Sequence, residues 1–168
     1  MVGMVKKTLI ISILLICVFM TSCTIEYHHD IDKKAKTWIQ YFKNEDVDGL
    51  FKLFCSDIKD NYSDKTLDEI RMAFEFIDGD IVEYKYKGEG GGGQTKDHYK
   101  TILYFCYPEY RIETSTGKKY TIIFSYKYIW KAKPECEGIG SIRVINYEGD
   151  RVYSGKEVNI GIDYDIHE

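Results

Sequence analysis

The sequence predicts an α+β fold in which N-terminal helices pack on a curved antiparallel sheet. Apolar residues recur at helical spacing before Gly79 and at alternating positions after it. The alternating segments follow one another through short turns, and strands connected in this way pair antiparallel. Helices that precede such a run of strands are typical of an α+β arrangement. One sheet face is so rich in aromatic residues that the helices are expected to cover it, giving a cone with an open end.

The N-terminus has the layout of an export signal. Lys6 and Lys7 precede an apolar run over residues 8–20, which is shorter than the ~20 residues that a helix needs to cross a bilayer. Small residues follow this run, as in secretory signals. An ordinary secretory signal and an uncleaved helical anchor are the alternatives to a lipoprotein signal.

The stretch Met20-Thr21-Ser22-Cys23 resembles the lipobox of bacterial lipoproteins. In that family the cysteine thiol takes a diacylglycerol, and a peptidase cuts the chain just before the cysteine. The resemblance implies a signal peptide over residues 1–22 and lipid attachment, with chains such as palmitate, at Cys23. It also implies anchoring at the extracytoplasmic face of the cell membrane, because two acyl chains hold a protein there stably.

Residues 23–30 are expected to form a polar tether, and residues 31–168 have the length of a single domain. Without Lys6 and Lys7, the chain has 21 basic and 27 acidic residues, a net charge near −6. An acidic balance argues against nucleic acid as a partner. The expected partners are the membrane, through the anchor, and an unidentified protein or small molecule.

Three segments before Gly79 have apolar residues on one helical face. These residues are Ile31, Ala35, Trp38, Ile39 and Phe42; then Val47, Leu50, Phe51 and Phe54; then Leu67, Ile70, Ala73, Phe74 and Ile77. Thr66 and Glu69 have the spacing of a capping box, which predicts the start of the third helix. Gly79 is expected to end it.

Strands are predicted over residues 82–87, 98–107, 110–114, 120–131 and 139–146. The segment 120–131 is the longest of them. Residues 88–97 hold five glycines in six positions and are expected to form a flexible loop. Pro108 marks a bend, and residues 115–118 form a hairpin turn.

The two periodicities also predict the core. One face of segment 120–131 carries Ile122, Phe124, Tyr126, Tyr128 and Trp130, and Lys127 and Lys85 are assigned to the opposite face. The residues expected to be buried between helices and sheet are Trp38, Phe42, Phe74, Phe124 and Val144. Ile123 and Ile129 are apolar on the outer face, which predicts that the C-terminal tail or a partner covers part of it.

Three stretches carry a resemblance to a known family: residues 74–82, 117–120 and 138–144. Over residues 31–146, the chain resembles the Gram-positive lipoproteins grouped as domain of unknown function 5104. The order of helices and strands is similar to the cone of nuclear transport factor and ketosteroid isomerase, also called the cystatin-like fold. The resemblance implies this fold and carries over no catalytic residue.

No catalytic or metal motif is found, and no cofactor is expected. Cys55, Cys106 and Cys136 follow the anchor cysteine, so at most one disulfide forms within the mature chain. Their spacing is not that of a zinc site. The glycine-rich segment lacks the Gly-Lys-Ser/Thr of a phosphate-binding loop.

The pocket candidates are aromatic residues of the sheet, because tyrosine combines a large apolar area with one polar group. These residues are Tyr84, Tyr86, Tyr126, Tyr128 and Trp130. The alternative is that they only pack the sheet, where tyrosine is common.

Three functions are compatible with this sequence. The first is a non-catalytic binding or accessory domain tethered to the membrane. The second is an enzyme of the isomerase or hydratase type that uses a carboxylate in the cone. The third is an immunity or inhibitor lipoprotein.

Overall fold

The computed structural model describes residues 31–98, 100–149 and 153–164. The chain separates into two compact units, residues 1–35 and residues 36–168. In the first unit, residues 31–35 are helical. The predicted signal peptide, Cys23 and the tether over residues 23–30 lie outside the described residues. The elements below belong to the second unit.

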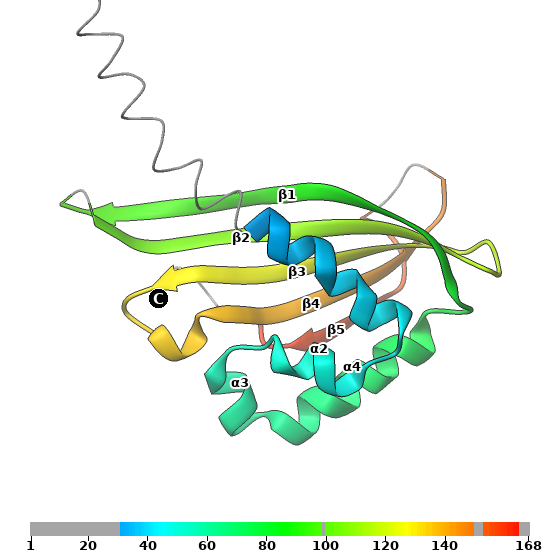
Figure 1. Ribbon diagram of the computed structural model, residues 1–168, viewed down its shortest axis with the longest axis horizontal. Helices are drawn as coiled ribbons and strands as arrows, with labels where there is room; N and C mark the ends of the chain where they lie inside the picture. Colours follow the sequence, from blue (N-terminus) through cyan, green and yellow to red (C-terminus); the bar gives the residue numbers. More distant parts are fainter. Residues whose placement is uncertain (1–30, 99, 150–152, 165–168) are drawn as a thin grey trace, which may run out of the picture. The chain divides into compact units, whose positions relative to one another are not determined.

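Helices come first in this unit, and a five-stranded antiparallel sheet in the order β1-β2-β3-β4-β5 follows (Figure 1). The helices are residues 36–43, α2 (Val47–Lys52), α3 (Ser56–Asn61) and α4 (Ser63–Phe76). The strands are β1 (Ile81–Asp97), β2 (Lys100–Thr114), β3 (Lys119–Trp130), β4 (Gly138–Tyr147) and β5 (Glu157–Gly161), with the short 3₁₀ helix η1 (Pro134–Cys136) before β4. The predicted α+β class, with helices packed on an antiparallel sheet, is therefore confirmed.

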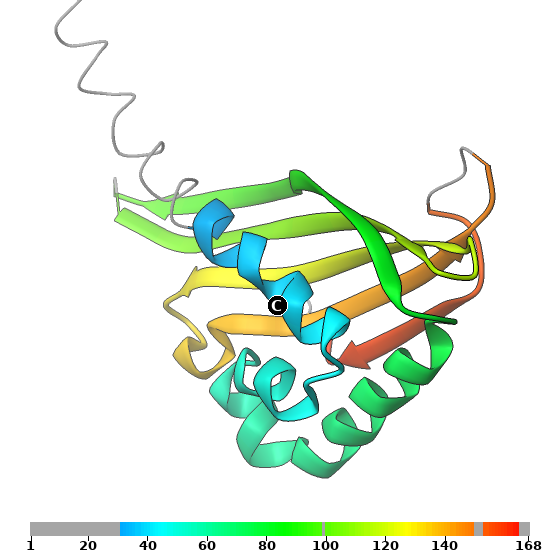
Figure 2. The same ribbon diagram turned by 45° about the vertical axis from the view of Figure 1, so that its right-hand side comes forward.

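Residues 36–43 run across one face of the sheet, which we call the inner face (Figure 2). Trp38 and Phe42 lie on this helix, and both rings contact Phe124 of β3. Trp38, Phe42, Phe124 and Val144 are buried as predicted, whereas Phe74 is only half-buried.

The predicted capping box at Thr66 is wrong. Helix α4 begins three residues earlier, at Ser63. The Thr66 N–H group already donates to the Tyr62 carbonyl at an N···O distance of 2.9 Å, so it is not an orphan donor. The Glu69 carboxylate is used elsewhere, since it accepts a hydrogen bond of 2.8 Å from the Gly161 N–H group of β5.

The glycine-rich segment is a strand and not the predicted loop, which makes β1 the longest strand at 17 residues. It pairs with β2 through several register shifts. Gly88, Gly91 and Gly92 have positive φ, which lets the strand bulge and bend at low cost. A Cβ atom on Gly92 would lie 2.6 Å from the Phe105 carbonyl oxygen, so the missing side chain allows close pairing.

Strand β2 continues through Pro108, and a register shift in its pairing with β3 corrects the predicted sheet face. Phe105 pairs with Lys127 and Tyr104 pairs with Ile129, so Tyr128 is one extra residue in β3. Such a bulge reverses the side-chain alternation beyond it. Trp130 consequently packs against Tyr164 of the C-terminal segment and not beside Tyr126 on the inner face.

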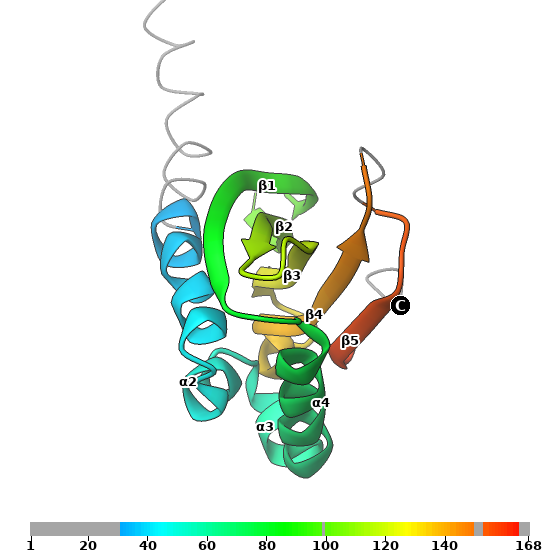
Figure 3. The same cartoon turned by 90° about the vertical axis from the view of Figure 1, so that its right-hand side faces the viewer.

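The C-terminal segment adds the fifth strand, which sequence patterns did not predict. Strand β5 pairs with β4 and lies on the side of the sheet away from residues 36–43 (Figure 3). The Ile162 N–H group then donates to the Gly140 carbonyl at 2.9 Å. This segment covers part of the outer face, as predicted, although the bulge at Tyr128 removes Ile129 from that face.

Lys127 is the clearest correction to the predicted surface. It is predicted on the outer face, as an inexpensive position to substitute if that face meets solvent, but its side chain is only 1% exposed. The strand alternation was right, because Lys127 does point away from the inner face. The predicted covering of part of the outer face by the C-terminal tail extends to Lys127, whose ammonium group lies over the Tyr164 ring.

Candidate functional site

Aromatic rings fill the inner face of the sheet. The Phe124 ring lies 5.1 Å from the Trp38 ring, 6.1 Å from the Phe42 ring and 6.0 Å from the Tyr110 ring. Tyr110 in turn contacts Tyr86 of β1 at 5.1 Å. Packed side chains of residues 36–43 therefore cover the inner face of the sheet around Phe124.

The five sequence-predicted pocket residues do not form one site. Tyr86, Tyr126 and Tyr128 take part in ring packing within the sheet. Tyr84 is 41% exposed on the edge strand β1, where its hydroxyl accepts a hydrogen bond of 3.3 Å from the Gln40 amide. Trp130 is buried near Tyr164 on the other side. The predicted lipid-bearing Cys23 lies outside the described residues.

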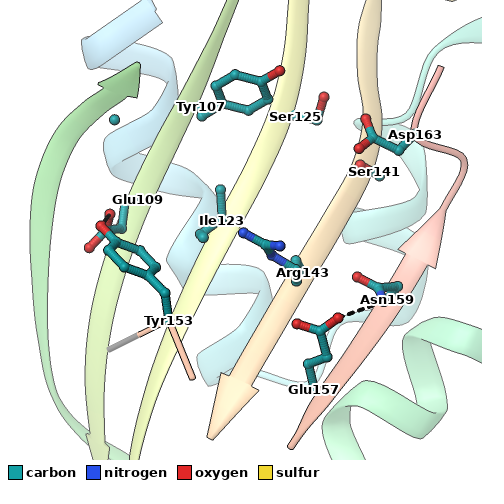
Figure 4. A pocket seen from close by; sticks show the side chains of 11 residues that line it. Tyr107, Glu109, Ile123, Ser125, Ser141, Arg143, Tyr153, Glu157, Asn159 and Asp163 are labelled. Atoms are coloured by element: carbon teal, nitrogen blue, oxygen red, sulfur yellow. Dashed lines mark hydrogen bonds between the residues drawn. The ribbon is translucent and has the colours of Figure 1, made fainter. Parts of the chain in front are cut away.

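The outer face of the sheet carries a pocket of about 590 Å³, within the size range of small-molecule sites. Side chains from β2, β3, β4 and β5 line it, together with residues of the C-terminal segment (Figure 4). We call it the outer pocket. None of the aromatic residues predicted from the sequence lines it.

A buried carboxylate forms one wall of the outer pocket. Glu109 is 5% exposed, and it accepts hydrogen bonds from the Tyr153 hydroxyl at 2.6 Å and from the Arg111 Nε at 3.1 Å. The bond to this carboxylate is the main reason that the pKa of Tyr153 is raised. Glu109 is thus compensated within the protein, and it holds Tyr153 against the sheet.

The floor of the pocket has donor groups that find no partner among the described residues. Ser125 of β3 is paired across the ladder with Ser141 of β4, and the next outer-face pair along the same strands is Ile123 with Arg143. In the part of the chain that the structure describes, no hydrogen bond or ion pair engages the Arg143 guanidinium or either serine hydroxyl. These three donors are therefore available to a ligand.

The opposite end of the pocket is acidic. Asp163, in the segment after β5, lines the pocket together with Tyr107 of β2. Burial, followed by the charge of Asp163, raises the pKa of the Tyr107 hydroxyl, which keeps that hydroxyl protonated. Glu157 of β5 lies away from Asp163, on the Arg143 side of the pocket (Figure 4). It accepts a hydrogen bond of 3.4 Å from Asn159.

Lys127 lies beyond this acidic end, beneath the C-terminal segment. Its Nζ atom has no hydrogen-bond partner among the described residues. It is 5.5 Å from the Trp130 ring centre and 5.2 Å from the Tyr164 ring centre. Burial is the main cause of the lowered pKa of Lys127, and the charge of Asp163 opposes that shift. Tyr164 holds the covering segment in place, because its hydroxyl donates to the Asp57 carboxylate of α3.

A second hollow of about 840 Å³ lies at the other end of the sheet, where Asp78, Lys118 and Tyr120 are already engaged within the protein. The Lys118 ammonium forms an ion pair of 2.6 Å with Asp78. The Tyr120 hydroxyl accepts from the Asp78 N–H group at 2.9 Å and donates to the Phe76 carbonyl at 3.2 Å. The outer pocket, with its unengaged donors, is the better candidate site.

Other kinds of site find little support within the described residues. No group of three or more His, Cys, Asp or Glu side chains is arranged to hold a metal ion there. Cys55, Cys106 and Cys136 are buried free thiols. Among the same residues, no helix has the length and apolar character needed to cross a bilayer.

The sequence is matched by a protein family whose description is "Domain of unknown function (DUF5104)", over residues 37–147. No curated protein matches the chain. The family match contains β1 to β4 and the pocket floor, while Tyr153, β5 and Asp163 follow it. Because the match covers well over half of the sequence, the chain belongs to the DUF5104 family.

Proposed function

We propose that this protein is a lipid-anchored, non-catalytic binding domain on the extracytoplasmic face of a bacterial membrane. In this proposal the outer pocket holds a small polar ligand. The observation that carries the proposal is the cluster of unengaged donors, Ser125, Ser141 and Arg143, on the floor of a pocket of about 590 Å³. Unsatisfied donors that converge in a pocket are typical of a ligand site.

The proposal treats the domain as a nuclear-transport-factor-like cone whose interior is filled. An isomerase or hydratase on this cone needs a carboxylate in an open cavity between helices and sheet. Trp38 and Phe42 pack on Phe124 in that position instead. The buried carboxylate of Glu109 is on the outer face, where Tyr153 and Arg111 already donate to it. Both points favour binding over catalysis.

The anchor is tested by replacing the predicted acylated residue. Cys23→Ala removes the only thiol that the lipobox offers, so the variant is expected to lose fatty-acid label and to leave the membrane fraction. The measurement is metabolic labelling with a fatty-acid analogue, followed by membrane fractionation. Undiminished labelling of the Cys23→Ala protein would rule out anchoring at this residue.

Binding is tested with the full-length protein in detergent and a panel of polar metabolites containing sugars, carboxylic acids, amines, amino acids and dipeptides. At least one member is expected to raise the melting temperature, because a ligand that binds only the folded state stabilises it. Arg143→Gln should abolish that shift.

Arg71→Gln is the matched control, since Arg71 is an exposed residue of α4 outside the pocket. It should respond as the parent protein does. A shift that survives Arg143→Gln would place the ligand elsewhere, and no shift with any compound would contradict the proposed function.

A further inference from the structure

We infer that the ligand of the outer pocket is a small zwitterion, an amino acid or a short peptide. Its carboxylate would bind Arg143 and the two floor serines, and its ammonium group would face Asp163. This inference rests on the proposed function and adds the chemical class of the ligand.

The carboxylate end follows from the arrangement of the floor. Ser125 and Ser141 are cross-strand partners, and Arg143 lies two residues beyond Ser141 on the same face of β4. A guanidinium offers a planar fork of N–H donors that matches the two oxygens of a carboxylate. Adjacent hydroxyls add donors for the remaining lone pairs. Figure 4 shows these side chains on neighbouring strands, with the Arg143 guanidinium over the floor near Ile123.

The ammonium end follows from the balance of charge. Glu109 and Arg111 form an ion pair of 3.1 Å, in which their charges neutralise each other. Arg143 remains as a cation, and Asp163 and Glu157 remain as anions. A simple anion would be attracted by Arg143 but repelled by Asp163 and Glu157, and a simple cation would be attracted by the two carboxylates but repelled by Arg143. A molecule that carries both charges is favoured at both ends.

Asp163 is available for this contact. It is exposed, and no hydrogen bond or ion pair involves its carboxylate in the described ranges. Figure 4 shows Asp163 beside Ser141, with Arg143 farther along β4. Asp163 and Ser141 therefore form the anionic end, and Arg143 lies two residues away along β4, a spacing of ~7 Å that a short zwitterion can span.

Isothermal titration calorimetry on the full-length protein in detergent tests the inference. The probes are L-leucine and L-alanyl-L-alanine, each compared with its C-terminal amide and with its analogue lacking the α-amino group. The zwitterions are expected to bind at least about tenfold more tightly than either relative, because losing one charged contact costs ~1.4 kcal/mol or more.

Two variants assign the ends of the ligand. Arg143→Gln should abolish binding of both zwitterions. Asp163→Asn should remove the preference for the α-amino group, so that the zwitterion and its deaminated analogue bind alike. Arg71→Gln should change neither result, and circular dichroism melting checks that each variant folds.

The outcomes separate this inference from the proposed function. A sugar or a simple carboxylic acid that binds in an Arg143-dependent way, while zwitterions do not, would overturn the zwitterion class and keep the pocket as a binding site. Zwitterion binding that is unchanged in both Arg143→Gln and Asp163→Asn would overturn the inferred contacts. A chain that binds no compound at all would overturn both.

Discussion

The Lys127 side chain is enclosed on the outer face of the sheet. Lys127 alternates correctly along β3 and faces outward, but Trp130, Tyr164 and the segment around Gly140 enclose it. Its ammonium group has lost water and has gained two aromatic rings without a hydrogen-bond acceptor among the described residues. An enclosed charge with so little compensation is expected to be costly.

We therefore expect Lys127→Met to stabilise the domain at neutral pH, by about 1–3 kcal/mol. Methionine has a similar length and fills the same space without an unsatisfied charge. Urea denaturation of Lys127→Met beside the exposed control Lys85→Met measures the difference. A marked loss of stability confined to Lys127→Met would show that the buried amine contributes a favourable interaction.

The pKa of Lys127 adds a pH dependence. Burial lowers this pKa in the folded state, so the unfolded chain binds the proton more tightly. The free energy of unfolding should therefore rise as the pH increases from the lowered folded pKa towards the ordinary lysine value, ~10.4. In Lys127→Met, the urea denaturation midpoint should change less with pH across that window. A pH dependence equal to that of the parent protein would contradict the lowered pKa of Lys127.

At the scale of elements, β1 is a strand whose glycine-rich part the sequence pattern did not predict. Its bulges place Gly92 at a φ of +141°, within close reach of the Phe105 carbonyl. Composition favoured a loop because glycine loses much backbone entropy when it is ordered. Pairing with β2 offsets that cost. The local sequence pattern of β1 does not predict this pairing, because the partner residues belong to another segment.

Gly92→Ala is expected to destabilise the domain by more than Gly88→Ala does. Both positions have positive φ, which costs a residue with a side chain ~1–3 kcal/mol, but a Cβ at Gly88 meets nothing within 4 Å. The difference between the two variants thus isolates the steric clash with β2. Thermal melting measures both, and equal losses would mean that β1 does not pair closely with β2 in solution.

At the scale of the whole domain, Phe124 joins residues 36–43 to the sheet. It is fully buried and contacts Trp38, Phe42 and Tyr110. Phe124→Ala should cost ~3–5 kcal/mol, through lost contacts and the cavity that remains. Lys85→Ala, at an exposed position, should cost little. Similar small losses in urea denaturation would mean that the helix does not cover this face.

The sequence by itself determined the helical region, the alternating region and most of the buried aromatic residues. These follow from local periodicity, because a helix and a strand each place apolar residues at a fixed spacing. Trp38, Phe42, Phe124 and Val144 could therefore be identified as core. The lipobox resemblance at Cys23 is also a local pattern, and it stays a prediction.

Only the tertiary structure decided the faces and the candidate site. The bulge at Tyr128 moved Trp130 away from the inner face, and the fifth strand brought Asp163 to the pocket that Arg143 lines. Ser125 and Ser141 became neighbours through the register of β3 and β4. Register, bulges and coverage depend on pairing between residues that are distant in sequence, so no local spacing records them.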